Sequence, residues 1–133
     1  MALSETDRTA VTELIARHGH LVDSGRIDRL DEVFTTDTTY DVTDLGGGVL
    51  HGTAAIREAT LALGDGHPVG HLVTNTVLTE TPDGIRALSK GLGVLADGTC
   101  GTVTYDDTVV RGEHGWRITH RTVLAHRRPL GAR

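Results

Sequence analysis

The sequence predicts an α+β fold with helices in its first half and strands in its second. Apolar residues repeat at helical spacing early in the chain, and from residue 71 onward the pattern is that of strands separated by turn signals. Helices segregated from strands favour α+β over a parallel α/β fold. The length of 133 residues predicts a single domain over residues 1–133. We expect a curved, mostly antiparallel sheet wrapped around three helices as a cone, with a cavity between them.

The first helix is predicted from a serine N-cap, Ser4, with Asp7 three residues later as an imperfect capping box. Its apolar face contains Val11, Leu14, Ile15, His18, Leu21 and Val22. Gly25 is expected to end it.

Two shorter helices are predicted next. One has apolar residues at Ile27, Leu30, Val33 and Phe34 and is broken by residues 35–37. The other is expected to start at Thr53 as N-cap, with Ile56, Ala59 and Leu63 on one face.

The strand predictions begin with a β-prone segment at 38–42, followed by a turn at 46–48. Four longer strands are expected at 71–78, 85–96, 100–111 and 116–126, and Asp97-Gly98 is a hairpin signal between two of them. Gly91 to Gly93 predicts a bulge or bend inside a strand. Residues 127–133 are expected to be a loose tail.

Composition argues against several classes of function. The net charge is −5, with 13 basic and 18 acidic residues, which disfavours nucleic-acid binding. The one cysteine excludes an internal disulfide and a multi-cysteine zinc site. No apolar run approaches the roughly 20 residues that span a bilayer, and the N-terminus has no signal-peptide pattern. We therefore expect a cytoplasmic protein with no membrane partner.

Alternation along the strands assigns candidate site residues to faces. In the last strand Trp116, Ile118, His120 and His126 share one face, which its apolar start predicts to be inward. His120 and His126, about 20 Å apart at about 3.3 Å per residue, cannot bind one metal together. A site that combines His71 with one of them is the alternative, but no His-x-His or His-x-x-x-His spacing supports it, so no metal site is expected. His71 and Asn75 share a face, but which face points inward stays open.

Asp23, at the end of the first helix, lies about 140° from the centre of the apolar face at about 100° per residue. Helical phase alone therefore predicts a solvent-exposed carboxylate. His71, taken alone, is equally consistent with a structural histidine in a strand.

Four local motifs together resemble the SnoaL-like branch of the nuclear-transport-factor-2-like superfamily, over residues 6–127. They are the run His20 to Leu30 with Val33 to Asp37, the segment Gly52 to Ile56, the segment Gly70 to Asn75, and Tyr105 to Arg111 followed by Gly115 to Ile118 and Arg121. The resemblance implies a cone-shaped α+β barrel with an internal cavity, in a homodimer or homotrimer.

The resemblance also implies a catalytic pair. Two enzymes of the superfamily, scytalone dehydratase and hexachlorocyclohexane dehydrochlorinase, use an aspartate and a histidine at positions that match Asp23 and His71. His71 would then be the base and Asp23 would orient it, and Tyr40 would be a donor to substrate oxygen. The expected substrate-binding residues are His18, His120, His126, Asn75 and Trp116. Either His126 or Arg127 matches a cavity-lining arginine.

The resulting hypothesis is a cofactor-independent dehydratase, cyclase or isomerase acting on a small hydrophobic metabolite, such as a polyketide-type intermediate. The first alternative is a non-catalytic ligand-binding or accessory subunit of the same fold. The second is an epoxide hydrolase, which would need an Asp–Arg–Asp set, to which Asp107 and Arg121 could belong.

Overall fold

Two α-helices and six strands form the part of the chain that the computed structural model describes, residues 3–132. Met1, Ala2 and Arg133, which belong to the expected domain 1–133 and its tail, lie outside it. The helices are α1 (Glu5–Asp23) and α2 (Thr53–Leu63). The strands are β1 (Phe34–Asp41), β2 (Val49–His51), β3 (Gly70–Thr81), β4 (Gly84–Val94), β5 (Cys100–Gly112) and β6 (Gly115–His126). Short 3-10 segments are η1 (Ile27–Glu32), η2 (Thr43–Leu45), η3 (Gly64–Gly66) and η4 (Pro129–Gly131).

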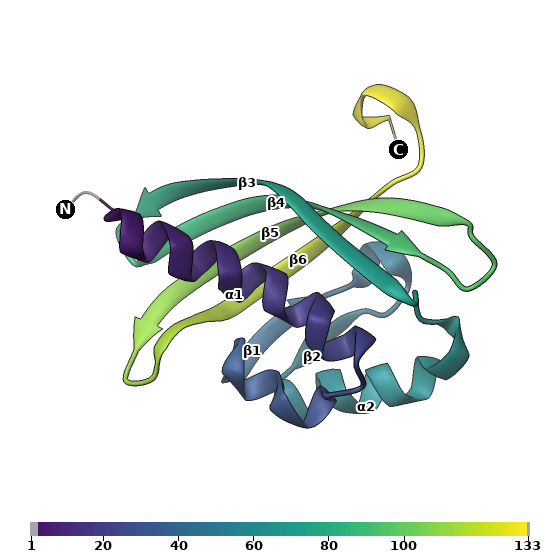
Figure 1. Ribbon diagram of the computed structural model, residues 1–133, viewed down its shortest axis with the longest axis horizontal. Helices are drawn as coiled ribbons and strands as arrows, with labels where there is room; N and C mark the ends of the chain where they lie inside the picture. Colours follow the sequence, from purple (N-terminus) through teal and green to yellow (C-terminus); the bar gives the residue numbers. More distant parts are fainter. Residues whose placement is uncertain (1–2, 133) are drawn as a thin grey trace.

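The strands form one sheet in the order β2-β1-β6-β5-β4-β3. β1 runs parallel to β6, and every other neighbouring pair is antiparallel. α1 lies across one face of the curved sheet, while α2 lies beside β1 and β2 at one end (Figure 1). This confirms the predicted α+β class and the four-strand meander, β3 to β6.

α1 forms as predicted. Ser4 is its N-cap and its Oγ accepts a hydrogen bond from the Asp7 backbone N–H at 3.1 Å. Gly25, with φ of +74°, follows its last turn in the left-handed conformation that favours glycine. The buried side chains of the helix are those of its predicted apolar face, namely Val11, Leu14, Ile15 and Leu21.

Two local predictions are wrong. Phe34 and the expected break at 35–37 belong to β1, because Phe34 pairs with Ile118 of β6 and is drawn into the sheet. The second helix is therefore only the 3-10 segment η1. Thr53 is the first residue of α2, not its cap: Gly52 is the N-cap, and Thr53 Oγ1 donates instead to Asp31 Oδ1 at 2.7 Å. That bond holds α2 to η1.

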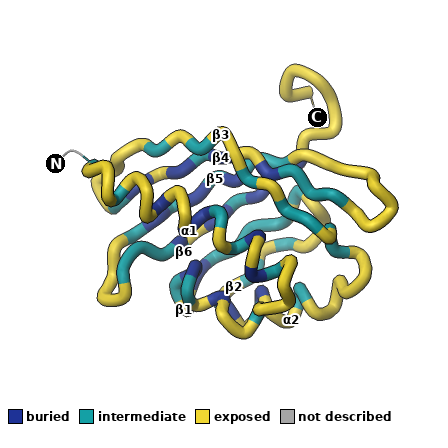
Figure 2. The backbone as a smooth tube through the Cα atoms, in the orientation of Figure 1, coloured by how far each residue is buried: buried dark blue, intermediate teal, exposed yellow. Residues whose placement is uncertain are grey.

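The core lies between α1 and the inner face of the sheet. Buried segments of β4, β5 and β6 face the helix (Figure 2). The fully buried apolar residues include Ile15, Ile85, Val109 and Ile118. Antiparallel partners share a face, so the register aligns Ala87 of β4 with Asp107 of β5, and Asp107 with Arg121 of β6. Asp107 and Arg121 therefore form a polar row across the otherwise apolar inner face.

A bulge in β6 reverses the predicted alternation. Thr108 pairs with His120 and Val109 with Ile118, so Thr119 is an extra residue opposite β5. Ile118 points inward as predicted, but beyond the bulge the buried residues are Arg121, Val123 and Ala125. His120 and His126 are exposed on the outer face.

A second bulge lies in β3, where the register shifts between Thr74 and Val77. Asn75 adopts φ of +58°, a left-handed conformation that asparagine tolerates better than most residues. Its side chain is exposed, so Asn75 does not share the inward orientation of His71 and Val73.

Gly91 makes room for an aromatic ring and does not mark a bulge. The pairing with β3 and β5 is regular from residue 91 to 93, contrary to the predicted bulge. A Cβ on Gly91 would lie 2.5 Å from Cε2 of Tyr105, so only glycine allows this ring to lie against β4.

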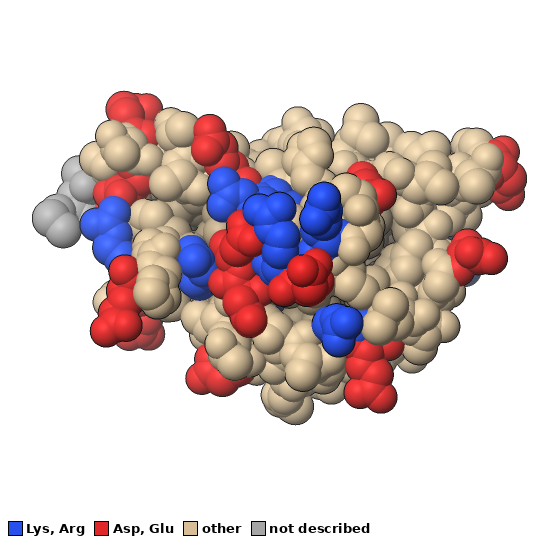
Figure 3. Space-filling model, turned by 60° about the horizontal axis from the view of Figure 1, so that its bottom comes forward, with Lys and Arg blue, Asp and Glu red and all other residues tan. Residues whose placement is uncertain are grey.

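The C-terminal segment 127–132 is exposed and contains the 3-10 segment η4, and the chain end stands away from the sheet (Figure 1). None of the helices in residues 3–132 is long and apolar enough to cross a membrane. On the face in Figure 3, Lys and Arg lie next to Asp and Glu in a mixed patch rather than in a continuous basic surface.

We expect Gly91→Ala to destabilise the protein by about 1–3 kcal/mol, because the new methyl group must displace the Tyr105 ring or the strand. Urea unfolding measures the difference. Gly101→Ala is the control: it lies on the neighbouring strand, where an added Cβ would have nothing within 4 Å, and should cost less than about 0.5 kcal/mol. Equal effects of the two substitutions would contradict the close contact.

Candidate active site

Asp23 and His71 form a two-point contact between the end of α1 and the start of β3. Oδ1 of Asp23 lies 2.5 Å from Nδ1 of His71, and Oδ2 accepts the His71 backbone N–H at 3.0 Å. The two side chains are 26% and 18% exposed, so the pair is partly buried at the edge of the sheet. Helical phase alone predicts an exposed Asp23, and the residue is exposed at the end of the helix, but its carboxylate is hydrogen-bonded to His71 of β3.

Gly19 explains how α1 comes so close to β3. It is buried one turn before Asp23, and a Cβ on it would lie 3.0 Å from the Cβ of His71. With no side chain at Gly19, the last turn of the helix rests directly on His71. Asp23 is thereby brought within hydrogen-bonding distance of the imidazole.

The contact sets the proton position on His71. An ionised carboxylate only accepts hydrogen bonds, so Nδ1 of a neutral His71 carries the proton and Nε2 has a free lone pair. Nε2 has no hydrogen-bond partner among residues 3–132. It is also not a buried atom, because the buried side-chain nitrogen or oxygen without a partner in this range is Ser89 Oγ. Nε2 of His71 is therefore reached by solvent. His71 also lines an open groove of about 950 Å³, with Val73, Leu92 and Leu130.

Asp107 and Arg121 form a second, fully buried pair in the middle of the inner face. Arg121 Nε donates to Asp107 Oδ1 at 2.7 Å and its Nη2 donates to Oδ2 at 2.9 Å. Their side chains are 0% and 1% exposed. Burial works against the charge on the guanidinium, but Asp107 outweighs it and raises the pKa of Arg121. The guanidinium also lies 4.2 Å from the ring centroid of Tyr105.

His18 contacts the remaining nitrogen of this guanidinium. Arg121 Nη1 lies 3.0 Å from His18 Nδ1. The imidazole meets the rings of Phe34 and Tyr40 edge-on, at centroid distances of 5.0 and 6.0 Å. Burial, and then the charge of Arg121, hold the pKa of His18 well below its usual value of 6.5. His18 is therefore neutral at pH 7, and its place on the apolar face of α1 is explained by Arg121.

Two tyrosines complete the polar inner surface. Tyr40 of β1 pairs in register with Arg121, and burial raises the pKa of its hydroxyl to about 12. Burial also raises the pKa of Tyr105. Both phenols therefore stay protonated at neutral pH and can donate hydrogen bonds. Tyr105 was missed as a site residue in the sequence, where only its two-residue spacing from Asp107 could have indicated it.

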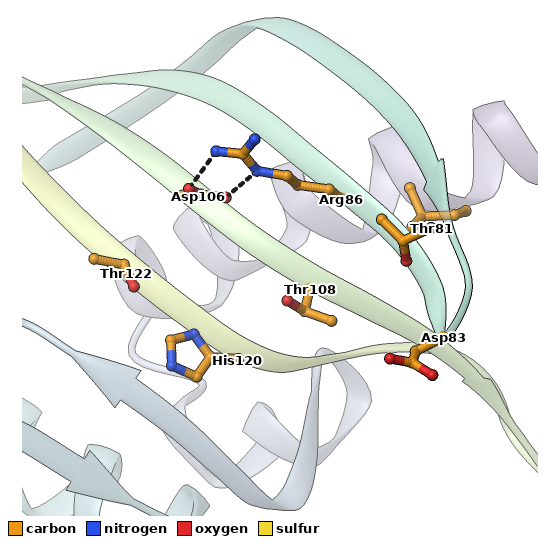
Figure 4. A pocket seen from close by; sticks show the side chains of 8 residues that line it. Thr81, Asp83, Arg86, Asp106, Thr108, His120 and Thr122 are labelled. Carbon is orange, nitrogen blue, oxygen red and sulfur yellow. Dashed lines mark hydrogen bonds and ion pairs between the residues drawn. The ribbon is translucent and has the colours of Figure 1, made fainter.

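His120 does not belong to this interior. It lies on the outer face with Thr108 and Thr122, beside the ion pair between Arg86 and Asp106 (Figure 4). These residues border an open hollow of about 440 Å³. The prediction of an inward His120 is wrong because the bulge at Thr119 adds one residue and reverses the alternation.

His126 is on the outer face for the same reason. Its Nε2 lies 2.6 Å from Thr104 Oγ1, and the inward residue at this end of β6 is Ala125. Arg127, the other candidate for this position, is exposed and donates through Nη2 to the carbonyl of Asp44 at 2.7 Å. Neither side chain lines the interior, but His126 borders the open groove that His71 lines.

Trp116 and Asn75 are also not at the site. Trp116 Nε1 donates to Asp7 Oδ1 at 3.2 Å, and the ring lies under Arg111, so Trp116 packs below the first turn of α1. That is the opposite end of the helix from Asp23. Asn75 is turned outward by the β3 bulge.

The predicted set is thus divided into two groups. His18 and Tyr40 lie against the buried Asp107–Arg121 pair, whereas Asp23 and His71 form a separate pair at the edge of the sheet. The epoxide-hydrolase alternative needed a second carboxylate on the arginine, but among the described residues Arg121 contacts Asp107 and the imidazole of His18 instead.

We expect Asp107→Ala to lower stability by about 3–5 kcal/mol, because it leaves the buried Arg121 charge without a counter-charge. The free energy of unfolding in urea is the measurement. Asp106→Ala is a matched control on the adjacent residue: its bidentate partner Arg86 is exposed, so the loss should stay below about 1 kcal/mol. Similar losses in the two variants would refute the assigned role of burial.

A pH dependence follows from the lowered pKa of His18. Below about pH 6.5 the unfolded histidine takes up a proton that the folded one does not, so the wild type loses stability as the pH falls. Relative to His18→Gln, which does not titrate, we expect a loss of up to about 1.4 kcal/mol per pH unit below pH 6.5 and a constant difference above it. Parallel stability curves between pH 5 and 8 would disprove a depressed pKa.

Comparisons with known proteins agree with this architecture. Residues 4–122 match the family model of the SnoaL-like domain. The uncharacterised protein Rv2910c of Mycobacterium tuberculosis is 30% identical over 125 residues, covering 87% of this chain and 83% of the relative.

Solved structures show the same fold. An NTF2-like protein with a cystatin-like fold from Novosphingobium aromaticivorans superimposes with a TM-score of 0.76 at 28% identity, over 96% of this chain and 84% of that one. The protein Aln2 from a Streptomyces species gives a TM-score of 0.72 at 25% identity, over 92% of each chain. The chain therefore belongs to the SnoaL-like family and has the NTF2-like, cystatin-type fold.

Proposed function

We propose that this protein is a cofactor-independent lyase or isomerase, of the dehydratase or cyclase type, that acts on a small hydrophobic metabolite. His71 is the general base, and Asp23 orients it. The observation that carries the proposal is the two-point contact of Asp23 with the ring and the backbone of His71. The family supports it, because SnoaL-like proteins include dehydratases, cyclases and isomerases.

The proton on Nδ1 faces the Asp23 carboxylate, so the free lone pair of Nε2 is the basic position. When Nε2 removes a proton from carbon or oxygen, the ring becomes an imidazolium, and the adjacent carboxylate stabilises that charge. A base positioned in this way contributes typically 10²–10⁴-fold to a reaction rate. The Tyr40 hydroxyl, kept protonated by burial, supplies a hydrogen bond to substrate oxygen.

The surroundings of His71 favour a substrate that is mainly aliphatic. The groove that His71 lines includes Leu72, Val73, Leu92 and Leu130, and the basic side chains of Lys90 and Arg128 border it as well. The whole chain has only one Phe, one Trp and two Tyr, so it offers few stacking surfaces. Partly reduced rings or aliphatic chains fit this lining better than extended aromatic systems.

A second candidate function is ligand binding without catalysis. It is favoured by the packing of the interior, because Val11, Leu14 and Ile15 of α1 fill the N-terminal half of the space above the sheet. The polar groups are left at the other end of the helix. A protein of this kind would bind a ligand near His71 and turn nothing over.

Hydrogen–deuterium exchange at carbon tests for the base without knowledge of the natural substrate. Cyclic ketones in D₂O, followed by proton NMR, should lose their α-proton signals faster in the presence of the wild type. We expect His71→Gln to slow the enzyme-dependent rate at least about 100-fold, and Asp23→Asn to slow it less. His120→Gln, on the outer face, should leave the rate unchanged.

If His71→Gln keeps the full exchange rate, the assignment of His71 as general base is wrong. Absence of exchange with the wild type across the panel would favour the ligand-binding alternative. Circular dichroism of each variant shows whether the fold persists, so that loss of the base is separated from loss of structure.

A further inference from the structure

We propose that His18 is a fixed, neutral hydrogen-bond donor to a substrate oxygen atom, with its proton on Nε2, and that Arg121 is the positioning residue that sets this state. The inference rests on the proposed function and adds a second imidazole with the opposite role. His71 offers a free lone pair, whereas His18 offers an N–H.

The tautomer follows from the contact between Arg121 and His18. A guanidinium can donate hydrogen bonds but cannot accept them. At 3.0 Å from Arg121 Nη1, His18 Nδ1 must therefore be the acceptor, and the single proton of a neutral ring lies on Nε2. On His71 the partner is a carboxylate, which accepts, so the proton lies on the other nitrogen, Nδ1.

The guanidinium itself is held in place. Its Nε and Nη2 atoms both donate to Asp107, at 2.7 and 2.9 Å, and only Nη1 is left for His18. Asp107 and Arg121 are almost completely buried, and the planar fork cannot turn without breaking two charge-assisted hydrogen bonds. The position of the acceptor nitrogen of His18 is therefore determined from within the sheet.

The Nε2 atom of His18 is available to a ligand. Phe34 and Tyr40 hold the ring edge-on, and Nε2 has no partner among residues 3–132. His18 is half-buried, and its Nε2 is not among the buried unpartnered atoms of the described chain, so a small part of this atom is reached by solvent. His18 directly precedes Gly19, on which a Cβ would lie 3.0 Å from the Cβ of His71, so the backbone of α1 brings the two histidines near each other.

The chemistry of the two imidazoles is complementary. When a C–H bond breaks, the proton forms the N–H bond at His71 Nε2, and the electron pair moves through the carbon framework to an adjacent carbonyl oxygen. His18 Nε2–H can stabilise that developing negative charge without giving up its proton. An ammonium group has N–H donors and no acceptor, so it cannot take the hydrogen bond that His18 Nε2–H offers.

The first test is NMR of the full-length, ligand-free protein labelled with ¹⁵N-histidine, between pH 5.5 and 8. Long-range ¹H–¹⁵N correlation distinguishes the two tautomers and the imidazolium, and the signal missing in His18→Gln assigns His18. We expect a neutral ring protonated on Nε2 over the whole range. Titration of His18 within this range, or a proton on Nδ1, would overturn the proposal.

Arg121→Lys tests the positioning role. It keeps the positive charge but removes the planar fork, so we expect both tautomers of His18 to appear. A His18 that stays purely Nε2-protonated in a folded Arg121→Lys protein would remove Arg121 from the proposal. If this variant does not fold, the wild-type spectrum still decides the tautomer.

The donor role is tested with two soluble probes of similar size. Cyclohexanone, added at tens of millimolar, should shift the Hε2–Nε2 signal of His18, whereas cyclohexylamine in its ammonium form should not. An equal response to both, or none to the ketone, would contradict donation to oxygen. These measurements need no turnover, so they can fail while His71 remains an active base, or succeed in a protein that does not catalyse.

Discussion

The buried ion pair between Asp107 and Arg121 is the interaction on which the site depends. All three nitrogens of the guanidinium are engaged, two by Asp107 and one by His18, and aromatic rings cover it. Two charges removed from water are tolerated only when their geometry is well matched. The pair therefore requires β5 and β6 to be in one register, which in turn fixes where Tyr105 and His18 can lie.

The Asp23–His71 pair is placed by a different principle. It joins the end of a helix to the first residues of an edge strand, and it is partly exposed. A partly exposed pair can be reached by a ligand, whereas the two hydrogen-bonded charges of Asp107 and Arg121 are kept from water. The chain separates these two environments by putting one pair at the margin of the sheet and the other in its middle. Gly19 lies between the two pairs along α1: it lets the helix rest on His71 of β3, and the residue before it, His18, contacts Arg121.

Two single-residue bulges decide which side chains enter the interior. The bulge at Thr119 turns Arg121 inward and His120 outward, and the bulge at Asn75 turns that residue away from His71. In a two-residue period, one inserted residue exchanges the faces of everything beyond it. Both bulges lie close to the polar row, so the local irregularity of the sheet and the composition of the site are linked.

The sequence by itself determined the α+β class, the cap and apolar face of α1, the four-strand meander, and, through family resemblance, the meeting of Asp23 with His71. These features depend on local periodicity, capping and motif order, and these signals come from residues that are close together in the sequence. Only the tertiary structure decided the facing of His120, His126 and Asn75, the recruitment of Phe34 into β1, and the partners of His18. Bulges, parallel pairing between β1 and β6, and the burial of Arg121 arise from contacts between segments far apart in the chain. The alternation of residues along a strand does not reveal where a bulge inserts an extra residue, because the bulge depends on how the strand pairs with its neighbour.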